Sequence, residues 1–95
     1  MRLEVSAEAE RDLAEMHLFG ALNYGQAQAD QYLAAILDEF RRITEWPLAS
    51  PERLEVRPPI RMRSCGAHNL FYDVDGDRVS IVRVLHHSAD WMNSL

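Results

Sequence analysis

This 95-residue sequence has no lysine and a single cysteine, Cys65. One thiol cannot form an internal disulfide, and chains without disulfides are typical of reducing compartments, so we expect a cytoplasmic protein. The N-terminus has no apolar run like a signal peptide, and no segment is long enough to span a bilayer, so we expect no membrane partner. Glycine-rich phosphate loops and serine nucleophile elbows are also missing, which excludes the common enzyme classes built on those motifs.

The sequence also lacks a metal-binding motif. His86 and His87 are adjacent, so in a strand they point to opposite faces and cannot easily share one ion, and His17 is distant in sequence. Cys65 has no obvious activating base beside it, which favours a buried or idle thiol over a nucleophile. We therefore expect no metal and no other cofactor.

Charge is distributed unevenly along the chain, whose net charge is −5. Residues 1–40 carry two basic and eight acidic side chains, residues 41–70 six and three, and residues 71–95 two and four. An acidic chain is a poor generic ligand for nucleic acid, because phosphates favour a basic surface, so we expect no direct sequence-specific nucleic-acid binding. All ten basic residues are arginine, which suits paired contacts with carboxylates, although a compositional bias of the source genome explains this equally well.

The most strand-like run of the sequence is Arg78–His86. Its apolar residues alternate between two sets, Val79, Ile81 and Leu85 on one face and Val82 and Val84 on the other. A strand that is apolar on both faces is a central strand, covered on both sides. Arg83 interrupts one set, and a lone guanidinium at such a position must reach a groove or a partner.

Two helices are predicted ahead of this strand. The first runs from Ala7 to Leu22 with Ser6 as its N-cap, and the second runs from Gln26 to Thr44 and ends before Pro47. The second helix repeats apolar residues at steps of three and four, namely Ala29, Leu33, Ile36, Phe40 and Ile43. Because a short turn at Asn23–Gly25 joins the two apolar helices, they must pack antiparallel as a hairpin.

The expected strands are Leu3–Val5 before the helices and, after them, Ile60–Ser64, His68–Asp73 and Arg78–His86. Turns at Cys65–Ala67 and Asp75-Gly76 link the last three strands as an antiparallel meander. Pro58 and Pro59 confine the preceding segment, which is expected to be extended from Arg53 to Arg57, to an edge of the sheet or to a place outside it. The tail, Ser88–Leu95, has room for one or two helical turns. The sequence therefore predicts one α+β domain, residues 1–95, with the helices on one face of the sheet.

One group of polar residues in the meander is a candidate for chemistry: Arg61, Arg63, His68, Tyr72 and Arg83. If these side chains converge on the sheet face opposite the helices, they supply the base and the cations of a metal-free ribonuclease. The alternative, which the sequence alone favours, is that the arginines form surface ion pairs with nearby acids: Glu52, Glu55, Asp73 and Asp77.

A second candidate surface is apolar and lies at the tip of the hairpin. Its residues are Leu18, Phe19, Leu22 and Tyr24, which exceed what one small sheet can cover. An exposed patch of this kind usually marks an interface, to be covered by an amphipathic helix or strand of a partner. The alternative is that it packs against the tail, through Trp91 and Met92.

Several motifs occur in an order and spacing that resemble a known family. They are Ala9…Asp12-Leu13…Met16, a long second helix ending at Trp46-Pro47, Arg61, Phe71-Tyr72, and Ile81-Val82-Arg83-Val84-Leu85-His86 followed by Asp90-Trp91. Over essentially its whole length the chain is similar to the RelE/ParE toxin superfamily of bacterial type II toxin–antitoxin systems, and within it to the ParE branch. The resemblance implies a RelE/ParE-like fold and a cognate antitoxin, ParD-like or of another kind, whose helix and extended tail wrap the hairpin and the sheet.

ParE-type toxins poison DNA gyrase, so the resemblance implies a gyrase-binding toxin that is not an enzyme. RelE-type toxins instead cleave messenger RNA in the ribosome, using basic residues on the sheet and a tyrosine or histidine near the C-terminus. This sequence departs from the RelE pattern, because it is acidic and has no tyrosine after His87. A ribosome-dependent endoribonuclease that uses the five meander residues is the alternative, and a degenerate toxin kept as the partner of a repressor complex is a third possibility.

The resemblance also implies roles for particular residues. We expect target engagement by Arg61, Arg83, His86, Asp90 and Trp91, and antitoxin binding by Leu18, Phe19, Leu22 and Tyr24. For His86 a purely structural role, fixing the tail to the sheet, is equally well supported.

Overall fold

The computed structural model describes residues 1–95 and contains five strands and three helices. In chain order they are β1 (Arg2–Val5), α1 (Ala7–Tyr24), α2 (Gln26–Glu45), β2 (Glu52–Arg53), β3 (Ile60–Cys65), β4 (His68–Asp75), β5 (Arg78–His86) and α3 (Trp91–Ser94). The strands form one sheet in the order β1-β5-β4-β3-β2. The predicted α+β class, the helical hairpin and the antiparallel meander of β3, β4 and β5 are confirmed.

The strand β5 lies in the interior of the sheet, as its apolar character predicts. β4 pairs with it antiparallel on one side, and β1 pairs with it parallel on the other, from Arg2 opposite Arg78 to Val5 opposite Ile81. β1 ends at Val5, so the second half of β5 has no neighbouring strand on that side. That half of the strand is where α1 begins.

Ser6 joins the start of α1 to β5. Its hydroxyl accepts a hydrogen bond from the Ala9 amide at 2.9 Å, which confirms the predicted N-cap, and donates one to the Val82 carbonyl at 2.7 Å. The Ser6 amide also donates to the Ile81 carbonyl at 3.0 Å. The cap therefore satisfies the first turn of the helix and part of the free edge of β5 at once.

A bulge interrupts β5 at the same level. Tyr72 of β4 pairs with Ile81, whereas Phe71 before it pairs with Arg83. Val82 is therefore an extra residue, and an extra residue turns the side chains beyond it to the opposite face. The helix-side core takes Val79, Ile81 and Val84, and the other face takes Val82 and Leu85. The predicted alternation is thus wrong beyond Ile81, because it assumed an unbroken period of two.

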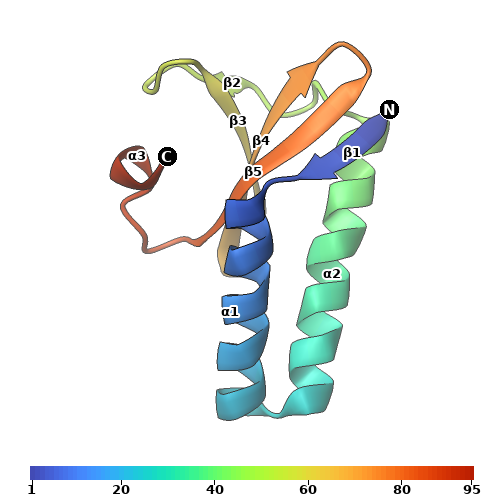
Figure 1. The fold of residues 1–95 in the computed structure, drawn as a ribbon, viewed down its shortest axis with the longest axis vertical. Helices are drawn as coiled ribbons and strands as arrows, with labels where there is room; N and C mark the ends of the chain where they lie inside the picture. The colour runs from blue at the N-terminus through green and yellow to red at the C-terminus, as the bar shows by residue number, and fades with distance from the viewer.

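The helical hairpin covers one face of the sheet with about half of its length, and Figure 1 shows its tip extending well past the strands. Where the hairpin meets the sheet, Ile36, Phe40 and Ile43 of α2 are almost completely buried in the helix-side core. Nearer the tip, Gly20 lies against Ala29, and a Cβ at position 20 would be 3.3 Å from the Ala29 Cβ. Small residues therefore allow the helices to stay close where no sheet supports them.

A smaller apolar cluster covers the other face of the sheet. Its buried centre is Ile60, Phe71 and Leu85, and Trp91 of α3 packs against it. In Figure 1, α3 lies away from the hairpin. The alternative in which the tail covers the hairpin tip is therefore wrong, because the tail is used on the second face of the sheet.

Some element boundaries differ from the prediction. Of the segment expected to be extended, Arg53 to Arg57, only Arg53 lies in a strand, because β2 consists of Glu52 and Arg53. Both helices of the hairpin are one or two residues longer than predicted, and α3 is a single short helix. None of the helices has the length and apolar character needed to cross a membrane.

Candidate functional site

The free half of β5 is tied to α1 by an ion pair between Arg83 and Asp12. The guanidinium donates through Nε to Asp12 Oδ2 at 2.8 Å and through Nη2 to Oδ1 at 3.0 Å, while the Val84 amide donates to Oδ2 at 2.9 Å. The hydrogen bonds to Asp12 raise the pKa of Arg83, so the pair stays charged. Asp12 thus replaces the missing strand by satisfying a backbone amide and orienting Arg83.

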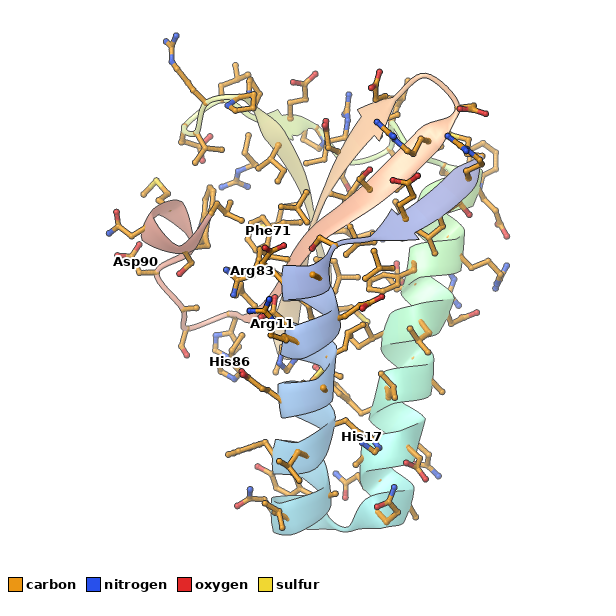
Figure 2. All side chains as sticks on the ribbon, viewed as in Figure 1. Arg11, His17, Phe71, Arg83, His86 and Asp90 are labelled. Carbon is orange, nitrogen blue, oxygen red and sulfur yellow. The ribbon has the colours of Figure 1, made fainter.

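The same guanidinium reaches the C-terminal tail. Arg83 Nη1 donates to the Ser94 carbonyl at 2.9 Å, and the Trp91 ring lies 5.3 Å from that of Phe71, measured between centroids. The Arg53 guanidinium is also near Trp91, 5.7 Å from its ring centroid and within cation–π range. We refer to Arg83, Asp90 and Trp91 as the tail surface; Figure 2 shows Arg83, Phe71 and Asp90 on the same side of the molecule.

Tyr32 of α2 and His68 at the start of β4 form a hydrogen-bonded pair that joins the hairpin to the sheet. Tyr32 Oη of α2 lies 2.6 Å from His68 Nδ1 and accepts a hydrogen bond from the Ala67 amide at 3.0 Å. Gly66 has φ of 58°, and a Cβ there would lie 2.8 Å from the Tyr32 ring, so glycine is required at this turn. Burial lowers the pKa of His68, and the neighbouring His86 lowers it further, so His68 is neutral at pH 7.

The five meander residues proposed for chemistry do not gather on an open face of the sheet, which corrects the prediction. Tyr72 is fully buried in the helix-side core, and its hydroxyl has no partner. Arg61, directly opposite Tyr72, donates to the Ser50 carbonyl at 2.5 Å, and Arg63 forms an ion pair with Glu39 of α2. The pleat directs Tyr72, Arg61 and Arg63 toward the helices, whereas the bulge in β5 turns Arg83 away from that face.

The expected surface pairing of the meander arginines is only partly right. Arg61 does pair with Glu52, at 3.5 Å, whereas Glu55 pairs at 3.2 Å with Arg53, which is not one of the meander arginines. Arg63 instead forms an ion pair with the nearly buried carboxylate of Glu39 on α2. Burial raises the pKa of the nearby Cys65 thiol. No group of three or more metal-ligating side chains is arranged to hold an ion.

The residues predicted to engage a target lie in different places. Arg83 and Trp91 meet at the tail surface, and Asp90 Oδ2 accepts a hydrogen bond from Asn93 Nδ2 at 2.6 Å at the start of α3. His86 is exposed, and its Nδ1 is bonded to Ser88 at 2.7 Å. Arg61 lies on the helix side of the sheet, remote from the tail surface. The part of these five residues in target binding stays a prediction. Arg83, His86, Asp90 and Trp91 lie near the C-terminal end of β5, and Arg61 does not.

The apolar residues of the hairpin tip are exposed, as predicted: Leu18, Phe19, Leu22 and Tyr24 have 60, 61, 77 and 64% of their surface accessible. Beside them, a groove of about 670 Å³ runs between the tip of the hairpin and the end of the sheet. Phe19 and Tyr24 line this groove together with Met16, Tyr32 and Leu85. The tip residues and this groove form one continuous candidate surface, which we call the hairpin surface.

Asp12 and Arg53 are functional candidates that the sequence reasoning missed. The signal for Asp12 was present, because the lone Arg83 in an apolar strand required a carboxylate partner. Nothing in the pattern selected Asp12 over the other acids of the first helix. Arg53 gave no signal, since its stacking on Trp91 depends on the path of the loop after β2.

The fold describes a small α+β protein built from a strand, a helical hairpin and a meander, with candidate interaction surfaces at the hairpin tip and around the C-terminal tail. A family model described as ParE toxin of type II toxin–antitoxin system, parDE, matches residues 3–91. Toxin ParE1 of Mycobacterium tuberculosis strain H37Rv is 38% identical over 68 residues, which cover 70% of this chain and 69% of that protein. Toxin ParE1 of Caulobacter vibrioides is 32% identical over 86 residues, 90% and 88% of the two chains.

The solved structures agree on the fold. A chain of the chromosomal ParDE toxin–antitoxin system from P. aeruginosa superposes with a TM-score of 0.79 at 17% identity, covering 90% of this chain and 95% of that one. This chain belongs to the ParE toxin family of type II toxin–antitoxin systems. Membership in a two-component system implies an antitoxin partner.

Proposed function

We propose that this toxin acts by binding and inhibiting DNA gyrase, and that a cognate antitoxin neutralises it. The observation that carries the choice of binding over RNA cleavage is the dispersal of the meander residues. Tyr72 is sealed in the core and Arg63 is bound to Glu39, so of the five meander residues only His68 and Arg83 line a common groove, where Asp12 already pairs with the arginine. A ribosome-docking nuclease also needs a basic surface, whereas this chain has a net charge of −5.

For the target we propose the tail surface. Arg83 is oriented by Asp12, and Trp91 packs against Phe71 with the Arg53 guanidinium near its ring, so contacts within the chain hold both side chains. Preorganised aromatic and arginine side chains are the residue types that dominate binding energy at protein interfaces. His86 borders this surface and also lines the groove, whereas Arg61 does not border it.

For the antitoxin we propose the hairpin surface. Leu18, Phe19, Leu22 and Tyr24 expose most of their surface where no element of this chain covers them. An amphipathic partner segment would remove this apolar area from water, which supplies about 25 cal/mol per Å² before the costs of association. Trp91 lies outside the hairpin surface and Leu22 lies outside the tail surface, so substitutions at these two residues would affect target and antitoxin separately, whereas Arg83 and His86 also line the groove.

The test is supercoiling by purified gyrase with increasing amounts of purified toxin, with and without the protein encoded by the neighbouring reading frame. We expect inhibition by the toxin and relief by that protein. We expect Trp91→Ala to weaken inhibition, and the matched variant Met92→Ala, whose side chain is exposed on the same short helix, to leave it unchanged.

Messenger RNA in a translating extract is the second arm of the test. Full supercoiling at a large excess of folded toxin rejects the gyrase proposal. Cleavage of the message at codon positions would replace it with the ribonuclease function.

A further inference from the structure

The guanidinium of Arg83 lies between α1 and the C-terminal tail and has hydrogen bonds to both. Its Nε and Nη2 donate to the two carboxylate oxygens of Asp12, at 2.8 and 3.0 Å, and its Nη1 donates to the Ser94 carbonyl at 2.9 Å. A guanidinium is planar and rigid, so a contact through two of its nitrogens also fixes the direction of the third. The direction of Nη1, and with it the contact to the tail, is therefore set by Asp12.

Asp12 is itself firmly placed. Its Oδ2 also accepts from the Val84 amide at 2.9 Å, so the carboxylate is bound both to a side chain and to the backbone of β5. Only 11% of the Asp12 side chain is exposed, compared with 24% for Arg83. A carboxylate this covered has little surface to offer a target. An effect of Asp12 on target binding must therefore pass through Arg83.

The segment that Arg83 reaches depends on such contacts for its position. α3 has only four residues, none of them buried, and a helix of one turn is not stable by itself. Its first residue, Trp91, packs on Phe71, and its last residue, Ser94, provides the carbonyl that Arg83 holds. A cation that donates to a carbonyl of the last turn also stabilises the end of a helix. α3 is thus fixed to the sheet at both of its ends.

We propose that Asp12 is a positioning residue for target binding: it orients Arg83, which holds the end of α3 and so keeps Trp91 on the sheet. This rests on the proposed function, in which the tail surface contacts the target, and it adds a residue that the target does not touch. Glu8 and Glu15 of the same helix act on Arg83 through charge, but only Asp12 hydrogen-bonds to it. The position of the tail therefore depends on this contact and not on the general acidity of α1.

The fluorescence of Trp91 measures the position of the tail without gyrase. The chain has two tryptophans, so Trp46→Phe, at a position that is 69% exposed, leaves Trp91 as the only one. In this background Asp12→Asn keeps an oxygen for the Val84 amide but places an NH2 group, which cannot accept, against Arg83. We expect acrylamide to quench Trp91 about twofold more strongly, because α3 loses one of its two attachments.

Glu8→Gln is the matched control for this measurement. It removes a negative charge that acts on Arg83 without removing a hydrogen bond to it, so the quenching of Trp91 should stay unchanged. Circular dichroism and urea denaturation identify the conditions in which every variant is folded, and the quenching is compared there.

Two C-terminal deletions test the other contact of the guanidinium and leave Asp12 in place. Removal of Ser94 and Leu95 takes away the acceptor of Arg83 Nη1, and it should raise the quenching of Trp91 as Asp12→Asn does. Removal of Leu95 alone gives Ser94 a terminal carboxylate, which still accepts, so Trp91 should remain protected. Equal protection of Trp91 after both deletions would show that Arg83 does not hold the tail.

Supercoiling by purified gyrase then links the tail to the proposed function. We expect Asp12→Asn to raise the toxin concentration for half-maximal inhibition about three- to tenfold, because binding must now order the tail, and Glu8→Gln to leave it unchanged. In an Arg83→Met background Asp12→Asn should have little further effect, because the residue through which it acts is gone. A role of Asp12 in stability alone predicts no loss of inhibition while the variant is folded.

Three further results would overturn the inference: a folded Asp12→Asn variant in which Trp91 is as protected as before, the same effect from Glu8→Gln, or an undiminished effect of Asp12→Asn in the Arg83→Met background. The failure of the proposed target looks different. If the quenching of Trp91 rises in Asp12→Asn while the wild-type toxin leaves gyrase unaffected, only the proposed target fails. If the wild type inhibits gyrase and folded Asp12→Asn inhibits it equally well, the inference fails and the proposed function stands.

Discussion

The two halves of the helical hairpin have the same secondary structure and opposite surroundings. Over the sheet, Phe40 and Ile43 have at most 1% of their surface exposed, whereas beyond it Leu22 is 77% exposed. Burial of apolar area stabilises a fold, so the half of the hairpin that lies over the sheet holds the domain together. The exposed half contributes little to stability, and its apolar residues are available for a partner.

The largest expected effect is a contrast in stability between the two halves. Phe40→Ala opens a cavity in the helix-side core and should lower the free energy of unfolding by about 3–5 kcal/mol. Leu22→Ala, at the tip, should change it by less than about 0.5 kcal/mol. Urea denaturation of both variants measures the difference, and similar losses would contradict the division between a structural half and an exposed half.

Asp12 lies where the covered half of α1 meets the bulge of β5. Asp12→Ala leaves Arg83 and the Val84 amide without their acceptor, and we expect a loss of about 2–3 kcal/mol in the free energy of unfolding. The matched variant Glu10→Ala removes an acid of the same helix that forms no ion pair, and it should be near neutral. Equal stability of the two variants would show that the Asp12 contacts contribute nothing net.

His68, at the border between the covered half and the groove, should give the fold a pH dependence of smaller size. Its pKa is lowered in the folded protein, so as pH falls below about 6.5 the unfolded state takes up a proton first. The contribution of His68 is therefore complete above that pH and is lost below it. His68→Gln should show a smaller drop in the free energy of unfolding between pH 7.5 and 5.5; an unchanged slope would mean that other groups cause it.

The prediction for Cys65 has the smallest expected effect, because it concerns the reactivity of the thiol and not the stability of the fold. Burial raises the pKa of its thiol, and the negative charge of Glu39 raises it further. The reactive thiolate is therefore scarce at neutral pH. We expect the folded protein to react with iodoacetamide more slowly than the urea-unfolded chain at the same pH, as mass spectrometry over time would show; equal rates would contradict the shift.

Much of the fold followed from local patterns. The a/d repeat of the second helix, the Ser6 cap and the Asp75-Gly76 turn each specify an element through residues close in sequence, and the structure has all of them. The exposure of Leu22 also followed, because a small sheet cannot cover the whole hairpin.

The grouping of polar residues did not follow from such patterns. The facing of Arg83 depends on the bulge in β5, and the bulge coincides with the place where α1 replaces β1. The facing of Arg61 and Arg63 depends on which face of the sheet the helices cover. The contacts made there join residues more than 70 positions apart, such as Asp12 and Arg83. The alternation of residues along β5 carries no information about contacts between residues so far apart in sequence.

The sequence by itself determined the elements and their order, since these depend on periodicity, caps and turns that neighbouring residues define, and its motifs carried the resemblance to a toxin family. Only the tertiary structure decided which faces the meander arginines occupy, which acid pairs with Arg83 and where the tail packs. The physical reason is that the start of α1 must pack against the free edge of β5 before these side chains have their partners. That contact exists only once the chain has folded.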